Sequence, residues 1–113
     1  MSKALQKATA HFKEQVSGEL KSIEIPQWDL TIYFRPAANF QQQMKVIEYT
    51  TKGDNTSAIL ETIIQRCLNA DGSKMFSHAD WDVLMREVDP NVLVQIVTIM
   101  NTKAKAAEDE LGN

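Results

Sequence analysis

The sequence predicts an α+β fold that is mainly α, in which one β-hairpin in the N-terminal half packs against four to five helices. Between residues 28 and 36, apolar and polar side chains alternate, which is typical of a strand with one buried and one exposed face. Downstream of Pro36, apolar residues recur instead at helical spacing. A chain of 113 residues, 43% of them hydrophobic, is long enough for one modest core.

The predicted hairpin pairs this strand with a shorter one that precedes it. Ile23 and Ile25 alternate with polar residues, and Pro26 is expected at the strand end because it cannot donate a ladder hydrogen bond. The turn is expected at Pro26 and Gln27, so that the second strand begins at Trp28. An isolated hairpin is only marginally stable in water. Its apolar face must therefore be covered by a helix or by the hairpin of another copy.

A helical arm, residues 1–20, is expected to precede a single hairpin-plus-helices domain, residues 21–108. The helix of the arm spans residues 3–17 and has a narrow apolar stripe. We expect this helix to lie on its own domain, with fraying or burial of the stripe by a partner as the alternatives. Residues 109–113 are expected to form a flexible acidic tail. The stripe of the arm consists of Leu5, Ala8, Phe12 and Val16.

Four helical segments are expected after the hairpin: 37–51; 55–68, with Asn55 or Thr56 as its N-cap; one that begins at Ser77; and 90–107. Each carries an apolar stripe that is expected to face the core. The last stripe is wider than a surface helix needs, which favours an additional interface. The four stripes are Phe40, Met44 and Ile47; Ile59, Leu60, Ile63, Ile64, Cys67 and Leu68; Trp81, Leu84, Met85 and Val88; and Val92, Leu93, Ile96, Val97, Ile99 and Met100.

Polar residues indicate where these segments start and which sides face solvent. Ser77 followed by Asp80 forms an approximate capping box, and Asp89-Pro90 is a strong helix start. In segment 55–68 four polar residues lie away from the apolar stripe and are expected in solvent: Glu61, Thr62, Gln65 and Arg66.

Composition argues against several classes of function. A net charge of −3 disfavours nucleic-acid binding, which needs a concentrated basic face. No apolar run approaches the roughly 18 residues of a membrane span, and the N-terminus lacks the apolar core of a signal peptide. The single cysteine, Cys67, leaves no internal disulfide to form. These features favour a reducing cytoplasm as the setting.

No catalytic, metal or cofactor site is predicted. A calcium loop starting at Cys67 would have a thiol where a carboxylate is required, and His78 would stand where a bidentate glutamate is needed. Cys67 and His78, with the distant His11, fall short of the four ligands of a structural zinc site. Since no nucleophile–base–acid arrangement stands out either, the chain is not expected to be an enzyme.

Two stretches and their order along the chain carry a family resemblance. Residues 25–36 place a Trp-bearing hairpin and an Arg-Pro before a helix, and residues 71–80 place an Asp-Gly turn before an acidic-capped helix. Over about residues 20–102, the chain resembles the tail assembly chaperones of long-tailed bacteriophages. It departs from them at Ala37-Ala38, where a Leu-Thr pair often begins the helix, and in the less acidic turn 69–72.

The resemblance implies a non-enzymatic role without a cofactor. Such chaperones bind the long tape measure protein in the host cytoplasm and keep it soluble while tail tube subunits assemble around it. They are absent from the mature virion and tend to form homo-oligomers. In many phages a frameshift also makes a longer form that recruits tube subunits, and Leu111-Gly112-Asn113 can be encoded with a slippery sequence.

Partner binding is expected at apolar residues that are more exposed than a minimal core requires. Two alternative functions remain open: a structural component retained in a phage or prophage tail, and a small bacterial protein-interaction adaptor. The candidates for contact with the tape measure protein are Leu5, Phe12, Leu93, Val97 and Met100, and those for self-association are Trp28 and Tyr33.

Overall fold

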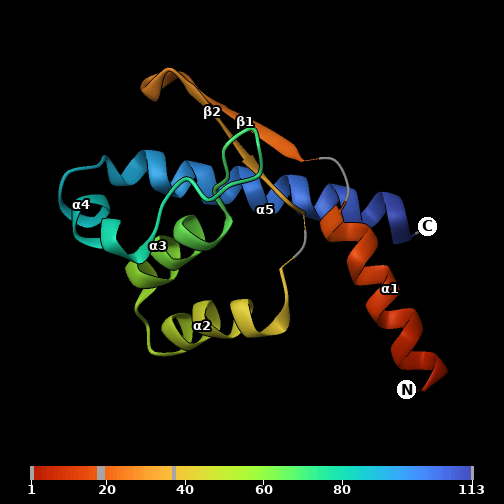
Figure 1. The fold of residues 1–113 in the computed structure, drawn as a ribbon. Helices are drawn as coiled ribbons and strands as arrows, with labels where there is room; N and C mark the ends of the chain where they lie inside the picture. Colours follow the sequence, from red (N-terminus) through yellow and green to blue (C-terminus); the bar gives the residue numbers. More distant parts are fainter. Residues whose placement is uncertain (1, 18–19, 37, 113) are drawn as a thin grey trace.

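The computed structural model describes residues 2–17, 20–36 and 38–112, and within them the side chains of 15–17 and 105–112 are not described. In the described residues, five α-helices accompany a two-stranded antiparallel hairpin, which confirms the predicted fold class (Figure 1). The elements are α1 (Lys3–Ser17), β1 (Lys21–Ile25), the 3₁₀ turn η1 (Pro26–Trp28), β2 (Leu30–Phe34), α2 (Phe40–Thr51), α3 (Asn55–Arg66), the 3₁₀ turn η2 (His78–Asp80), α4 (Trp81–Arg86) and α5 (Pro90–Gly112).

The hairpin has one buried face, as its alternating sequence predicts. Ile23 lies opposite Ile32, and Lys21 lies opposite Phe34. The apolar side chains at Ile23, Ile25, Ile32 and Phe34 are each no more than 2% exposed. The intervening residues are exposed or half-buried, as a period of two requires. Leu30, which the same alternation assigns to the buried face, is 40% exposed, so that part of the prediction is wrong.

The strand boundary predicted at Trp28 is wrong. Trp28 ends the 3₁₀ turn η1, and β2 begins only at Leu30. Pro26 occupies the start of this turn, where its fixed φ is favourable, and its carbonyl accepts a hydrogen bond of 3.2 Å from the Asp29 N–H. Asp29 adopts a left-handed conformation with φ of 52°, which a short polar side chain tolerates. The turn is therefore longer than two residues.

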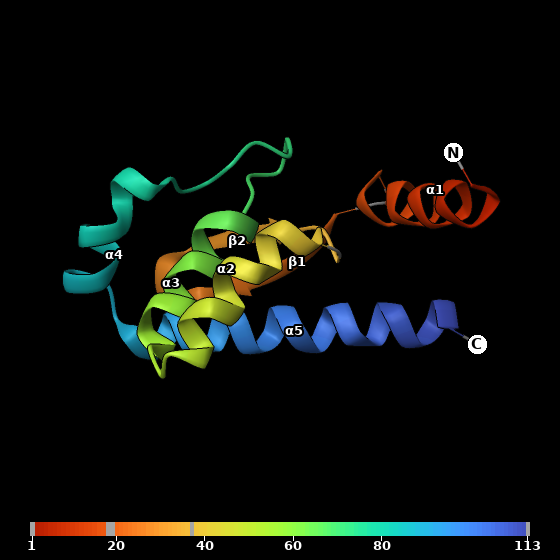
Figure 2. The ribbon, with the colours of Figure 1, turned by 90° about the horizontal axis from the view of Figure 1, so that it is seen from below.

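The core lies between the hairpin on one side and α3 and α5 on the other (Figure 1). In the same view, α2 lies on the side of α3 remote from the hairpin, and α4 closes one end of the body. At the opposite end, α1 and the last turns of α5 project outward together (Figure 2). The fully buried centre contains Ile25, Ile32, Phe34, Leu60, Ile63, Ile64, Cys67, Ile96 and Met100.

Both outer edges of the hairpin make contacts with the rest of the chain. On β2, Tyr33 exchanges two backbone hydrogen bonds with Leu68, of 3.0 and 2.7 Å. On β1, the Lys103 ammonium group of α5 donates to the Ser22 carbonyl oxygen. These contacts occupy backbone groups that would otherwise be open to another strand.

The helix starts follow local capping chemistry and shift several predicted bounds. The segment expected from residue 37 becomes helical only at Phe40, because Asn39 and Gln42 form a reciprocal capping box. Asp54, rather than Asn55 or Thr56, caps α3 by accepting from the Ser57 N–H at 3.0 Å. The Ser77–Asp80 capping box is confirmed, but it opens a 3₁₀ turn before the short α4.

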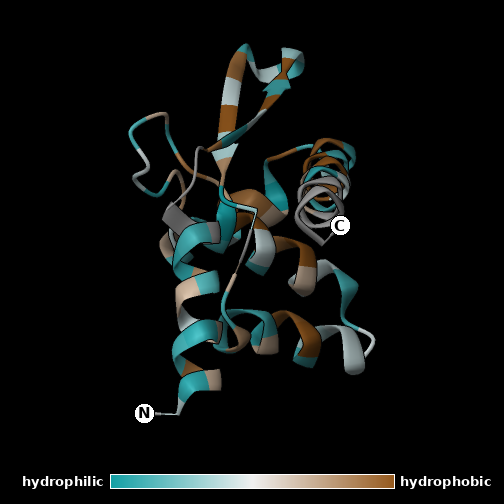
Figure 3. Cartoon of the chain, turned by 90° about the vertical axis from the view of Figure 1, so that its right-hand side faces the viewer, coloured by the Kyte–Doolittle hydropathy of each residue, from teal (hydrophilic) through white to brown (hydrophobic). Residues whose placement is uncertain are grey.

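Two helix ends also differ from prediction. Helix α3 ends at Arg66 because Cys67 is extended and Leu68 pairs with Tyr33. Helix α5 continues to Gly112, past the predicted end at residue 107 and into the expected acidic tail. Helix α1 begins and ends where the sequence predicts, and it is mostly hydrophilic with narrow apolar bands (Figure 3).

Candidate functional site

An apolar groove runs between α2, α3 and α5. Its volume of about 490 Å³ falls within the range of about 300–1,000 Å³ that is usual for ligand pockets. Six of the described residues that line it are apolar and seven are polar, a mixed lining that suits an amphipathic helix. The apolar lining comprises Ala38, Val46, Ile47, Ala58, Ile59 and Val97, and the polar lining comprises Gln43, Thr50, Asn55, Thr62, Gln65, Arg66 and Asn101.

Beside this groove, α2 exposes a stripe of large apolar side chains. Phe40 is 73% exposed, Met44 37% and Ile47 46%, so the prediction that these residues face the core is wrong. We refer to these three residues as the α2 stripe. They recur at helical spacing on one side of α2, and Ile47 also lines the groove. Ile47 therefore belongs both to the α2 stripe and to the groove lining, whereas Phe40 and Met44 lie on α2 outside that lining.

The orientation of α2 follows from which side of α3 is not already buried in the core. The apolar side of α3 is already buried against the hairpin and α5. Helix α2 packs against α3, but it approaches small or polar residues such as Ala58 and Thr62. Its inner side consists of half-buried residues, including Val46 and Tyr49, and no residue of α2 is buried. The Tyr49 ring also lies 6.2 Å from that of Trp81, which ties α2 to α4.

Arg66 stands at the end of α3 and lines the groove. Its guanidinium Nη2 donates to the Arg35 carbonyl oxygen at 2.9 Å, and its carbon Cζ lies 5.8 Å from the centre of the Phe34 ring. Burial lowers the pKa of Arg66 from its usual value, while the adjacent Cys67 has a smaller opposite effect. The predicted solvent exposure of Arg66 is only partly right, since it is half-buried.

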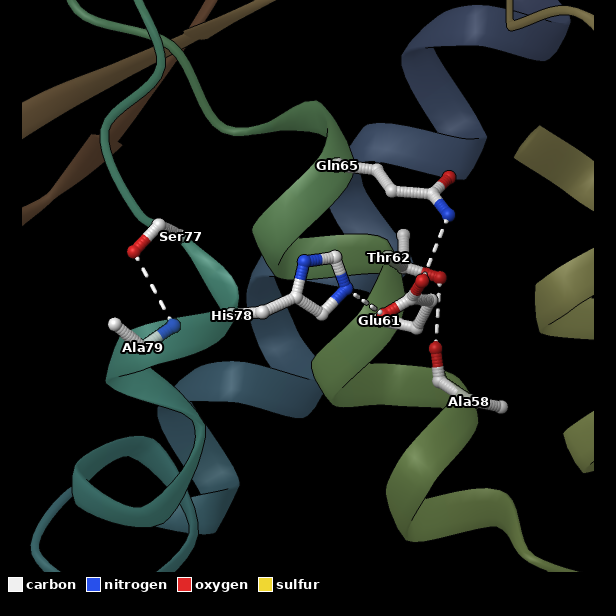
Figure 4. A network of polar contacts seen from close by, with 7 residues as sticks. All are labelled: Ala58, Glu61, Thr62, Gln65, Ser77, His78 and Ala79. Atoms are coloured by element: carbon white, nitrogen blue, oxygen red, sulfur yellow. Dashed lines mark hydrogen bonds and ion pairs between the residues drawn. The ribbon is translucent and has the colours of Figure 1, made fainter.

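A second polar feature, a buried carboxylate, lies on another side of α3 (Figure 4). Glu61 is 1% exposed. Its Oε2 lies 2.8 Å from His78 Nε2, and its Oε1 accepts from the Gln65 side chain at 3.1 Å. Thr62 is also buried and donates to the Ala58 carbonyl oxygen. The prediction that Glu61 and Thr62 face solvent is therefore wrong.

The Glu61–His78 pair connects η2 to α3 rather than forming a recognisable reactive centre. Sequence spacing could not reveal it, because the two residues are 17 positions apart on different elements. In the described part of the chain, no group of three or more His, Cys, Asp or Glu side chains could hold a metal ion. Burial raises the pKa of the Cys67 thiol to about 12, against a smaller opposing effect of Arg66, so this cysteine is poorly suited to act as a nucleophile.

The predicted partner-binding residues fall into two groups. Leu5 is 51% exposed on α1, Phe12 is half-buried in a shallow cleft of about 340 Å³, and Val97 lines the groove. In contrast, Leu93 is 4% exposed and Met100 is 0% exposed. The expected exposure of these two is wrong, because the wide stripe of α5 is buried against other elements of the core.

The two residues predicted for self-association are both half-buried. Trp28 packs against the core cluster, and the backbone of Tyr33 pairs with Leu68. Sequence reasoning missed the α2 stripe as a candidate surface. The available signal was a second apolar line on the same helix, formed by Val46 and Tyr49, which offered an alternative inner side.

The chain shares its fold with a protein of known structure, the tail assembly chaperone of bacteriophage HK97. The TM-score is 0.65, and the match covers 88% of this chain and 93% of the other at 14% identity. No protein-family model matches the sequence, and neither does any curated protein. Among the helices of the described residues, none is long and apolar enough to cross a membrane.

Proposed function

We propose that this chain is a phage tail assembly chaperone that binds the tape measure protein and keeps it soluble during tail tube assembly. The main support is the α2 stripe, in which three large apolar side chains are exposed on the helix that borders the groove. The fold shared with the HK97 tail assembly chaperone supports it. The role is non-enzymatic and belongs in the host cytoplasm, and the protein leaves before the virion matures.

The physical task of such a chaperone matches this surface. A long client with exposed apolar helix faces aggregates through those faces. A groove with a mixed apolar and polar lining can cover a client helix by helix-in-groove packing. Many copies along one client provide avidity without tight individual sites, and weak sites permit release.

The proposed contact surface combines predicted residues with those that the fold adds. Val97 and Ile47 lie in the groove, and Met44 extends the surface along α2. Leu5 and Phe12 on α1 remain proposed contacts at the other end of the molecule. Leu93 and Met100 instead hold α5 in the core. We also propose self-association through the hairpin at Trp28 and Tyr33, and recruitment of tail tube subunits through a longer, frameshifted form.

Co-expression with the tape measure protein tests the proposal. The wild-type chain is expected to raise the soluble fraction of this client, and the variant Met44→Asp/Ile47→Asp is expected to lose that effect. Val83→Asp is the matched control, because Val83 is 50% exposed but lies on α4, outside the groove. If the client is equally insoluble with and without the wild-type chain, the proposal is wrong.

Mass spectrometry of purified virions separates the chaperone from the alternative of a retained tail component. A chaperone is expected to be absent from virions that contain the tape measure protein. Stoichiometric amounts of this chain in the virion would instead support a structural role, for which the α2 stripe would be a contact within the tail.

A further inference from the structure

Arg66 is a half-buried cation for which the described chain supplies no acidic partner. Its Nη2 donates a hydrogen bond of 2.9 Å to the Arg35 carbonyl oxygen, which is a neutral acceptor. Within the described residues, the ion pair found joins His78 to Glu61 and does not involve Arg66. Charged groups withdrawn from water are usually paired. A guanidinium has five N–H donors in a planar fork, which leaves donors for a further acceptor.

Arg66 gives the groove a positive charge that no other described residue of the lining offsets. Of the described residues that line it, Arg66 alone carries a charge, and the other polar members are amides and hydroxyls. No lining carboxylate competes for the guanidinium. An occupant with one acidic side chain would therefore be complementary to the groove both in charge and in the pairing that Arg66 lacks.

We propose that the groove recognises an amphipathic helix of the client whose apolar face carries one Asp or Glu, and that this carboxylate pairs with Arg66. The inference rests on the proposed function and specifies the client segment. Helix α3 has 12 residues and is therefore about 18 Å long, so the groove matches about three turns of a client helix. Arg66 stands at one end of α3, which places the acidic residue near one end of the bound segment.

Arg66 also has a structural role that the experiment must separate from recognition. Arg66 lies in the last turn of α3, where its positive charge interacts favourably with the negative end of the helix dipole. It also packs over the Phe34 ring. Removal of the side chain could therefore lower stability without any effect on recognition. A test in which the charges of both partners are changed distinguishes the two roles.

The probes are synthetic peptides of about 20 residues that tile the tape measure protein, with binding to the full chain measured by fluorescence anisotropy. For the tightest peptide, each Asp or Glu is replaced in turn by Asn or Gln. One such replacement is expected to weaken binding by about 10- to 100-fold. Arg66→Gln should weaken the parent peptide to a similar degree and show no further loss with the replaced peptide.

Reversal of the charges on both partners separates recognition by Arg66 from its structural role. Arg66→Glu is expected to abolish binding of the parent peptide and to regain binding when the critical peptide acid is changed to Arg. Lys45→Gln is the matched control, since Lys45 is an exposed cation on α2 that does not line the groove. Circular dichroism of each variant verifies that the chain is folded, and Arg66→Lys, which keeps the charge but not the fork, should lose only part of the affinity.

The failures of the two proposals are distinguishable. If peptides bind but no acidic replacement and no Arg66 variant changes the affinity, the proposed function stands and the Arg66 inference is overturned. If no tape measure peptide binds the wild-type chain, both are overturned. If Arg66→Gln abolishes self-association in sedimentation velocity while peptide binding is unchanged, the carboxylate belongs to a second copy, which also contradicts the inference.

Discussion

The two sides of α3 show how the same apolar periodicity produces a core in one place and an exposed surface in another. On the hairpin side, Ile32, Phe34 and Ile63 are all 0% exposed. On the other side, α2 carries an equally regular stripe in which Phe40 is 73% exposed. The difference arises from the available cover, because the hairpin and α5 occupy the apolar side of α3 and leave α2 its polar side.

The comparison separates residues that stabilise the chain from residues that remain available to a partner. A buried stripe contributes through the apolar area it removes from water. An exposed stripe of comparable hydrophobicity contributes little to folding and creates a liability to aggregation, unless a partner covers it. Substitutions on the two sides should therefore affect different measurements.

The largest expected effect is on the core side. Phe34→Ala removes a fully buried ring and should lower the free energy of unfolding by about 3–5 kcal/mol. Phe40→Ala, the matched control on the α2 stripe, should change it by no more than about 0.5 kcal/mol, as expected for an exposed position. Urea denaturation followed by circular dichroism measures both. Equal losses would show that α2 packs as part of the core, which would contradict the difference between the two sides of α3.

A smaller loss is expected where α3 meets η2. His78→Ala leaves the buried Glu61 carboxylate with Gln65 as its remaining side-chain partner. Loss of a partner from a buried polar group should cost about 1–3 kcal/mol of unfolding free energy. His11→Ala, on the exposed surface of α1, is the control and should change stability little. A neutral result for His78→Ala would mean that the contact does not hold η2 against α3.

The smallest effect concerns chemical access rather than stability. Cys67 is 0% exposed and its pKa is raised to about 12 by burial, so labelling by a thiol reagent at pH 8 should be slow in the folded chain. A cysteine at exposed position 47, in a Cys67→Ala background, should react at the rate of an unfolded control. Similar rates at both positions would contradict the contrast between core and groove.

The same thiol predicts a pH dependence. A pKa raised in the folded state means that folding disfavours the thiolate. The stability contributed by the neutral buried thiol is therefore fully present below the unfolded pKa of about 9. It declines as the pH rises from there towards about 12. Urea titrations at pH 8 and pH 10 should show a decrease that Cys67→Ala lacks.

Local patterns predicted the fold well. Alternation identified the buried face of the hairpin, helical spacing identified α1 and the core stripe of α3, and Ser77 with Asp80 identified a capping box. These features depend on neighbours in the sequence. The start of β2 was misplaced because the 3₁₀ turn at Pro26 is favoured by φ preferences that the alternating pattern does not express.

The candidate site was harder to predict because it depends on which surfaces cover one another. Phe40, Met44 and Ile47 have the periodicity of a core stripe, and periodicity alone does not show whether another element is available to bury them. The exposure predicted for Leu93 and Met100 is wrong in the opposite direction, because α5 contacts both α3 and β1 and its wide stripe is buried in the core. Glu61 and His78 meet only through the tertiary fold.

The proposed function requires that the groove and the α2 stripe contact the tape measure protein. A photo-crosslinking amino acid placed at position 47, co-expressed with the tape measure protein and irradiated, tests it most directly. Position 83 on α4, of similar exposure, is the comparison. We expect a crosslink to the client from position 47 and little or none from position 83. Crosslinking from position 83 alone, or equally from both, would contradict it.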